Sequence, residues 1–207
     1  RISRHSTVLM WVFILVTLAA MIPFNIHFAF LGDFLASKGF QQVTAVTYIG
    51  QAAEVFCMLL VTWAMRKFGV KWSIVAGLVA LTVRYAAYYF AAGDLTSLVY
   101  IGILIHGVIF GFFVVGGQVY VGKTTSADMQ GQAQGFYALM AFGVGSFIGT
   151  FVNDALIKLY TRPEVLPGGT TVLKGDWASV WLVTLACSLA CTLALALLFN
   201  PKKEAAQ

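Results

Sequence analysis

Apolar residues are concentrated along this chain in six long runs, which short polar connections separate. A helix needs about 20 residues to cross a bilayer, and each run reaches that length. The runs lack the alternation of a strand, and only helices or closed barrels satisfy their backbone in lipid. The pattern predicts an all-α membrane protein, a single domain over residues 1–207. Its six transmembrane helices are expected at about residues 7–34, 41–65, 72–92, 95–121, 132–160 and 177–199.

The composition agrees with a multi-pass membrane protein. The chain is 60% hydrophobic and 10% charged, whereas a soluble domain has about 25% charged residues. The net charge of +5 comes from basic residues in the short connections, so we expect no nucleic-acid partner. Three cysteines lie inside apolar runs without the spacing of a metal site or a disulfide: Cys57, Cys187 and Cys191.

The basic residues also predict the orientation. Eight of the 13 Lys and Arg residues fall on the side of the two termini, four fall on the opposite side, and Arg84 lies within a span. By the positive-inside rule, both termini are expected in the cytoplasm. The longest connection, residues 161–176, should then be an external, mobile loop. Since the first run is too long for a signal peptide and the chain begins at Arg1, we expect a fragment of a longer protein.

One polar face interrupts the second apolar run. Thr44, Thr47, Gln51, Glu54 and Met58 are spaced three or four residues apart, which places them on one side of a helix. A charged residue at the centre of a spanning helix costs about 2.5–3.5 kcal/mol on insertion scales. Such residues usually face a partner or a solute pathway. This face is therefore the first candidate for a solute site, and a structural ion pair between Glu54 and Arg84 is the alternative.

Other polar residues in the spans are few. Asn25 and His27 follow Pro23, which should kink the first helix and place them at a cavity wall or against a neighbouring helix. Arg84 lies toward the outer end of the third run, where we expect a structural or snorkelling role. His106 and Phe110 share a face of the fourth run and suit either a planar ligand or helix packing.

Glycines recur four residues apart in the fourth and fifth runs. This spacing favours close approach of helices, and a hinge for rocking motions is the alternative. The pairs are Gly107 with Gly111, Gly131 with Gly135, and Gly145 with Gly149.

Patterns typical of enzymes are absent. The chain has no His-Glu-x-x-His, no Gly-x-Ser-x-Gly and no Walker loop. The three histidines have no metal-ligand spacing. We therefore expect no enzymatic activity, no metal and no cofactor.

The stretch from Gln51 to Lys71 resembles the major facilitator superfamily. The basic loop between two helices of that superfamily matches Arg66-Lys67-Phe68-Gly69-Val70-Lys71. Met65 stands where the superfamily usually has an acidic residue. More closely, the chain resembles the carboxy-terminal half of bacterial nucleoside:proton symporters. The matching stretches are Gln51–Glu54, Arg66–Lys71, Arg84–Tyr85, Gly107–Phe113, the Gly-rich run from Ala133, and Asp176–Trp177 to Trp181–Leu182.

This resemblance implies that the six helices correspond to helices seven to twelve of a twelve-helix transporter that binds nucleoside between its halves. It implies that Gln51 and Glu54 contact nucleoside, with Asn25 on the preceding helix. The family Gln three residues before this Asn is Ile22 here. His106 takes the place of a family Tyr, and Phe110 matches a family Phe. An acidic residue that follows this Phe in relatives is Gly111 here, so proton coupling falls to Glu54 or to the missing half.

We thus expect a bacterial inner-membrane transporter that moves nucleosides, with protons, by alternating access. Its partners would be nucleoside, protons, the lipid bilayer, and either an N-terminal six-helix half or a second copy of the chain. Two alternatives remain open at this point: a transporter of another polar solute such as a sugar, and a non-transporting membrane sensor or assembly subunit. The replacements at Ile22, His106 and Gly111 keep the first alternative open.

Overall fold

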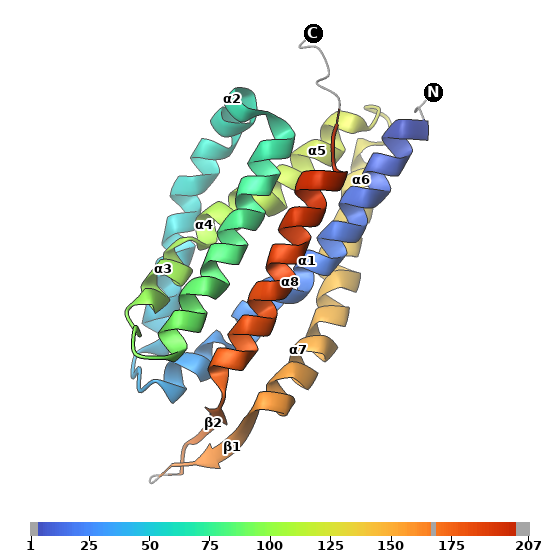
Figure 1. Cartoon of the computed structure of the whole chain (residues 1–207). Helices are drawn as coiled ribbons and strands as arrows, with labels where there is room; N and C mark the ends of the chain where they lie inside the picture. Colours follow the sequence, from blue (N-terminus) through green and yellow to red (C-terminus); the bar gives the residue numbers. More distant parts are fainter. Residues whose placement is uncertain (1–3, 167–168, 202–207) are drawn as a thin grey trace.

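The computed structural model of the chain describes residues 4–166 and 169–201. Arg1, Lys202 and Lys203 of the charge pattern, and residues 167–168 of the long loop, lie outside these ranges. Within them, five helices are long and apolar enough to cross a membrane. They pack side by side as an elongated bundle (Figure 1). Their bounds as membrane spans are Val8–Ser37, Val43–Ala92, Leu98–Thr124, Gln130–Tyr160 and Trp177–Leu198.

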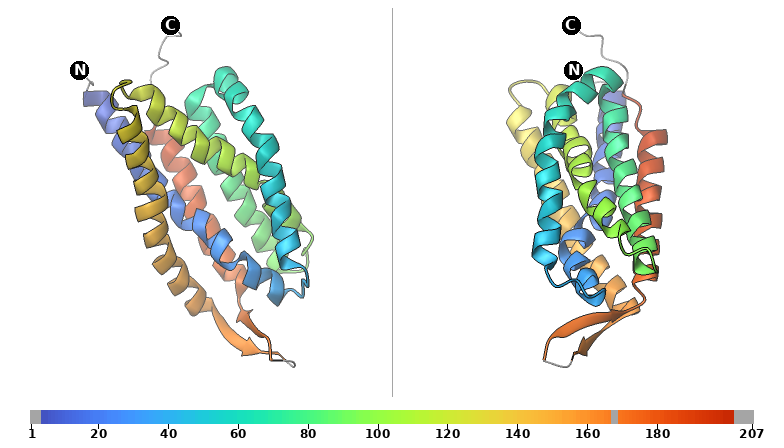
Figure 2. Two further views of the ribbon diagram at one scale, coloured as in Figure 1. Left: turned by 180° about the vertical axis from the view of Figure 1, so that it is seen from behind. Right: turned by 90° about the vertical axis from the view of Figure 1, so that its left-hand side faces the viewer.

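The second of these, α2 (Val43–Ala92), is 50 residues long and is bent back on itself at Gly69. Gly69 has φ 80° and ψ 164°, a conformation that glycine adopts without the steric penalty of a Cβ. The bend divides α2 into a first arm, residues 43–68, and a second arm, residues 70–92. The two arms run in opposite directions with the fourth span between them, and the bend lies at the end of the bundle where α1 (Arg4–Ser37) begins (Figures 1 and 2).

The next two spans each contain a π-helical turn, where the sequence predicted uninterrupted α-helix. The fourth apolar run forms α3 (Leu98–Leu104), α4 (His106–Val108), η1 (Ile109–Val115) and α5 (Gly116–Thr124), with Ile105 as a turn between α3 and α4. The fifth forms α6 (Gln130–Ala138), η2 (Leu139–Gly145) and α7 (Ser146–Tyr160). Such π segments are rare in helices and frequent at functional sites.

The connection before the last helix contains two paired β-strands, where the sequence predicted a loop. Strands β1 (Thr161–Val165) and β2 (Thr171–Gly175) pair antiparallel, with Thr161 opposite Gly175. The ladder satisfies backbone groups, and an ion pair of 2.6 Å joins the Lys174 amine to the Glu164 carboxylate. Alternation was too weak over five residues to reveal these strands. The hairpin lies at the end of the bundle opposite the α2 bend (Figure 1).

The last helix, α8 (Trp177–Leu198), packs against the second arm of α2 and against α1. Aromatic rings fill this contact: Trp181 is stacked on Tyr85 at 5.9 Å between centroids and lies 5.2 Å from Phe34. The Thr192 hydroxyl donates a hydrogen bond of 3.1 Å to the Leu78 carbonyl oxygen. The core of the bundle therefore lies between α1, α8 and the second arm.

The glycine pairs differ in what they contact. A Cβ added at Gly107 would lie 2.6 Å from the Ala53 carbonyl oxygen, and one at Gly145 would lie 2.9 Å from the Met21 Cβ. These positions permit the close helix approach that the spacing predicted. Gly131 and Gly135 have no such neighbour within 4 Å, so the prediction was wrong for that pair.

Candidate functional site

Glu54 lies on the first arm and faces the fourth span. Its Oε2 atom is 3.4 Å from Nε2 of His106, and 18% of the Glu54 side chain is exposed. The helices come this close because Gly107 has no side chain at the crossing, where an added Cβ would also lie 2.8 Å from the Glu54 Cα. A small residue next to His106 thus brings the carboxylate within reach of the imidazole.

Arg84 lies on the second arm and is fully buried. Its Nε donates a hydrogen bond of 3.0 Å to the Gly102 carbonyl oxygen, and its Nη2 lies 2.9 Å from Nδ1 of His106. Of the two roles predicted for Arg84, these contacts agree with the structural one, and snorkelling is wrong because the fourth span covers the side chain. The alternative of an ion pair between Glu54 and Arg84 also needs correction, since His106 lies between the two charged groups.

His106 is 1% exposed, and aromatic rings surround it. His27 of α1 stacks on it at 5.4 Å between centroids, and Phe28 meets it edge-on at 5.4 Å. Phe110, one turn later in the fourth span, lies 6.2 Å from the His106 ring. A direct contact of His106 with substrate stays a prediction, and in this arrangement its two nitrogens face Arg84 and Glu54.

His27 contributes to packing rather than to an open cavity wall. It is 7% exposed, and its Nδ1 lies 3.0 Å from the Tyr88 hydroxyl. The neighbouring Tyr85 hydroxyl donates a hydrogen bond to the Pro23 carbonyl oxygen. The second arm thus holds α1 through polar contacts around the predicted proline kink.

The remaining predicted residues differ in their surroundings. Gln51 is exposed on the first arm, one turn before Glu54. Phe110 is partly buried and lies within η1. Asn25 faces α7, where its Nδ2 donates to the Met21 carbonyl oxygen at 2.7 Å and to the Ser146 hydroxyl at 3.1 Å. The contacts therefore join Glu54, His106 and Phe110 in one cluster and place Asn25 at the α1–α7 contact.

Gly111 follows Phe110 inside η1 and packs against the first arm. A Cβ at this position would lie 2.9 Å from a Val61 methyl group and 3.7 Å from the Cys57 backbone. A longer side chain here would displace Val61. The only carboxylate in the cluster is consequently that of Glu54 within the described residues.

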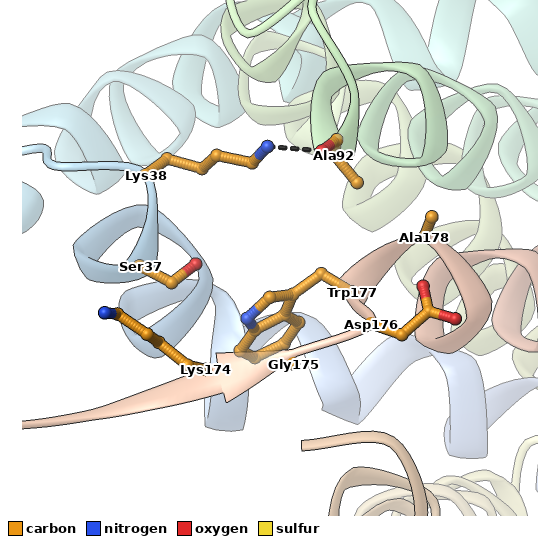
Figure 3. A pocket seen from close by; sticks show the side chains of 8 residues that line it. All are labelled: Ser37, Lys38, Ala92, Lys174, Gly175, Asp176, Trp177 and Ala178. Carbon is orange, nitrogen blue, oxygen red and sulfur yellow. Dashed lines mark hydrogen bonds between the residues drawn. The ribbon is translucent and has the colours of Figure 1, made fainter. Parts of the chain in front are cut away.

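The surface cavities of the bundle include two of similar size. One, of about 270 Å³, lies beside the hairpin and is lined by Ser37, Lys38, Ala92, Lys174, Gly175, Asp176, Trp177 and Ala178 (Figure 3). Within it the Lys38 amine donates to the Ala92 carbonyl oxygen at the end of α2. The other, of about 220 Å³, is lined by Asn25, Ala29, Phe30, Thr150, Phe151, Asn153 and Asp154.

Of these cavities, the one beside Asn25 includes a predicted site residue, whereas the larger lies at the hairpin. The cluster around Glu54 lines neither. Among the described residues no group of three or more His, Cys, Asp or Glu could hold a metal ion. The side chains of this cluster can form hydrogen bonds, stack through the rings of His106 and Phe110, and exchange a proton at Glu54.

Comparison with known proteins assigns the family. The sequence model described as "Nucleoside H+ symporter" matches residues 5–204. The chain belongs to the nucleoside H+ symporter family. Curated relatives include the nucleoside permease NupG of Escherichia coli K12, 28% identical over 173 residues, and the xanthosine permease of the same organism, 27% identical over 164 residues. These matches cover 82% and 74% of this chain but 39% and 37% of the relatives.

Among solved structures, a crystal structure of the nucleoside transporter NupG matches this symporter-family chain with a TM-score of 0.75 and 25% identity. The match covers 94% of this chain and 49% of that one. The predicted fold class, an all-α membrane protein with the fold of half a major facilitator transporter, is thereby confirmed. The chain spans less than half of the length of the relatives it matches, and those relatives are named as transporters and permeases.

Sequence reasoning missed the part that Arg84 takes in this cluster. A signal was present, because a guanidinium inside an apolar run must find partners or reach the interface. The sequence placed Arg84 near a helix end and so left a structural role and a position at the interface both open. The missing information was the register between the second arm and the fourth span, which sets Arg84 opposite Gly102 and His106.

Proposed function

We propose that this chain is the carboxy-terminal half of a twelve-helix transporter that moves nucleosides together with protons by alternating access. One observation carries the proposal: a partly exposed carboxylate, Glu54, lies within an apolar spanning helix against His106. Such a group marks a solute or proton pathway by default. Membership in the nucleoside H+ symporter family supports nucleoside as the solute.

Within this proposal the first arm supplies the polar contacts. Gln51 and Glu54 offer amide and carboxylate groups for the ribose hydroxyls or the base edges. Phe110 offers a ring face on which a base can stack. Asn25 adds a polar contact to the proposed substrate site from α1. His106 contributes to the same site, either by contacting the substrate with its own ring or by orienting Glu54. Glu54 also takes the proton, because protonation removes the cost of its charge in the membrane.

The proposed membrane is the bacterial inner membrane, with both termini in the cytoplasm. The α2 bend, which carries Arg66, Lys67 and Lys71, lies at the end of the bundle where α1 begins and α8 ends (Figure 1). The positive-inside rule favours the cytoplasm for that end. The exposed first arm would face lipid and a second six-helix half, either from the same polypeptide or from another copy.

Uptake of labelled uridine tests the proposal, in cells that produce the natural polypeptide carrying this chain. We expect concentrative uptake that collapses when a protonophore removes the proton gradient. Gln51→Ala and Glu54→Ala should each abolish it at unchanged membrane levels, whereas Arg66→Gln at the exposed bend should not. Unlabelled adenosine should compete and a sugar should not. Wild-type uptake in both site variants, or competition by sugar alone, would contradict the proposed site or substrate.

A further inference from the structure

We propose that Arg84 is a positioning residue that acts through His106 on the Glu54 carboxylate. The three side chains form one line of polar contacts, here called the Arg84 bridge, from the buried second arm through the fourth span to the first arm. The inference rests on the proposed function for its consequence in transport. Its structural content, the hydrogen-bonding state of His106, stands by itself.

The Arg84 guanidinium, at the inner end of the bridge, is held in one position. Arg84 is fully buried, and its Nε hydrogen bond to the Gly102 carbonyl oxygen, at 3.0 Å, anchors the plane of the guanidinium. The Nη2 atom then lies 2.9 Å from Nδ1 of His106. A guanidinium stays charged and has only donors. Nδ1 of His106 must therefore be the acceptor and carry no hydrogen.

This contact determines the form of the imidazole. With Nδ1 accepting, the ring hydrogen of a neutral His106 is on Nε2, the atom that faces Oε2 of Glu54 at 3.4 Å. An imidazolium would instead direct an N–H at the Arg84 donor. The arrangement thus selects one neutral tautomer, and His106 presents a donor to the carboxylate without itself carrying the transported proton.

The contact to Glu54 is longer than the usual 2.7–3.2 Å of an N–H···O bond, by about 0.2 Å or more. With 18% of its side chain exposed, Glu54 is directed by the bridge and still free to turn toward a ligand. The other titratable groups packed on the bridge are His27, which stacks on His106, Tyr88, which bonds His27, and Tyr85, which bonds the Pro23 carbonyl. Glu54 is the acidic group that meets the bridge.

The histidine form is measured directly by ¹⁵N NMR of histidine-labelled wild-type protein, with His106→Gln identifying the His106 signals. We expect an unprotonated Nδ1 and a protonated Nε2. In Arg84→Met, which is apolar and of similar length, this preference should be lost, and Arg84→Lys should keep part of it. The inference is overturned if wild-type His106 carries its hydrogen on Nδ1. It is also overturned if Arg84→Met folds and leaves the tautomer unchanged.

Transport kinetics test the consequence. We expect Arg84→Met to raise the KM for uridine about tenfold, as loss of one hydrogen bond to a charged group predicts. His106→Gln keeps an acceptor and a donor and should raise the KM less than His106→Leu, which keeps neither. The exposed Arg66→Met is the control. A purely structural role would lower protein levels without changing KM and would affect the Gln and Leu variants alike.

The two proposals fail in different ways. If the wild-type polypeptide takes up no nucleoside, the proposed function fails, and the NMR result still decides the bridge. If wild-type uptake is normal and Arg84→Met leaves the KM unchanged at normal protein levels, the bridge fails as a positioning device and the proposed function stands.

Discussion

The two arms of α2 have similar lengths and apolar compositions, yet they differ in burial. Four residues of the first arm are buried, namely Gly50, Val61, Ala64 and Met65, against twelve in the second arm. The second arm is enclosed by α8, η1 and α1. The first arm contacts the fourth span at Gly50, Ala53 and Val61, and most of its residues are exposed.

This difference separates two tasks within one helix. The second arm holds Arg84, Tyr85 and Tyr88 in fixed contacts, so it serves as the frame. The first arm carries Gln51 and Glu54 on a helix that the other helices of this chain leave largely uncovered. A carboxylate in an apolar span needs the fixed contacts that the second arm supplies. A site that binds and releases a solute needs a helix face that the rest of this chain leaves uncovered, as on the first arm.

A substitution at Gly77 on the second arm should have the largest effect. An added Cβ would lie 2.7 Å from the Phe113 Cβ and 2.9 Å from its Cα. Because the second arm is enclosed, neither helix can shift, and Gly77→Ala should prevent recovery of folded protein. Size-exclusion chromatography of detergent-solubilised protein measures this. Gly131→Ala is the control, since nothing lies within 4 Å of a Cβ added at that position. A normal yield of folded Gly77→Ala protein would contradict the view that the second arm is tightly enclosed.

Two leucines provide a matched pair across the arms. Leu78 on the second arm is fully buried, and Leu59 on the first arm is 76% exposed. Leu78→Ala should reduce the free energy of unfolding by about 2–5 kcal/mol, the range for buried Leu→Ala changes. Leu59→Ala should change it by less than about 0.5 kcal/mol. Thermal unfolding in micelles compares the two, and equal losses would show that the first arm is enclosed as well.

Gly107→Ala should affect the site more than the fold. Its Cβ would lie 2.6 Å from the Ala53 carbonyl oxygen, but fewer helices of this chain cover the first arm, so it can shift more readily than the second arm. We expect a folded protein in which Glu54 is displaced from His106 and the KM for uridine rises about tenfold. Uptake kinetics at matched membrane levels measure this. An unfolded Gly107→Ala protein would indicate that the first arm cannot shift to make room for the added methyl group.

The smallest effect concerns α8, which covers the second arm. Hydrogen bonds from the Ser179 hydroxyl and amide, the latter at 3.0 Å, hold the pKa of Asp176 below its usual value. Since the folded pKa is depressed, this stabilisation is present above the unfolded pKa of about 3.9 and is lost as the pH falls. Asp176→Asn keeps an acceptor but not the charge. The melting temperature of wild type should therefore fall more steeply below about pH 4 than that of Asp176→Asn, and parallel curves would contradict this.

The fold class followed from the sequence because bilayer thickness fixes the length of an apolar helix. The bend at Gly69 followed from the short basic loop that contains it. The π-helical turns at Ile109–Val115 and Leu139–Gly145 did not, because their residues are apolar in any helical register. The hairpin was missed because the pairing of Thr161 with Gly175 depends on two short segments meeting across a turn.

The site was predicted in part. Spacing alone placed Gln51 and Glu54 on one helix face, and His106 with Phe110 on another. That Glu54 meets His106 depends on the crossing at Gly107, which a single sequence does not give. The same holds for Arg84, whose partners come from the register between two helices. The role of each predicted residue in binding nucleoside stays a prediction.

Protection of a cysteine at position 58 tests most directly whether nucleoside occupies the open face of the first arm. Met58 lies one turn after Glu54 and is 40% exposed. In a protein with Cys57, Cys187 and Cys191 replaced by serine, Met58→Cys should react with a membrane-permeant maleimide and lose that reactivity in saturating uridine. Lys67→Cys, at the exposed bend, should react equally with and without uridine. Labelling of Met58→Cys that uridine leaves unchanged, in protein that still takes up uridine, would contradict the proposed site.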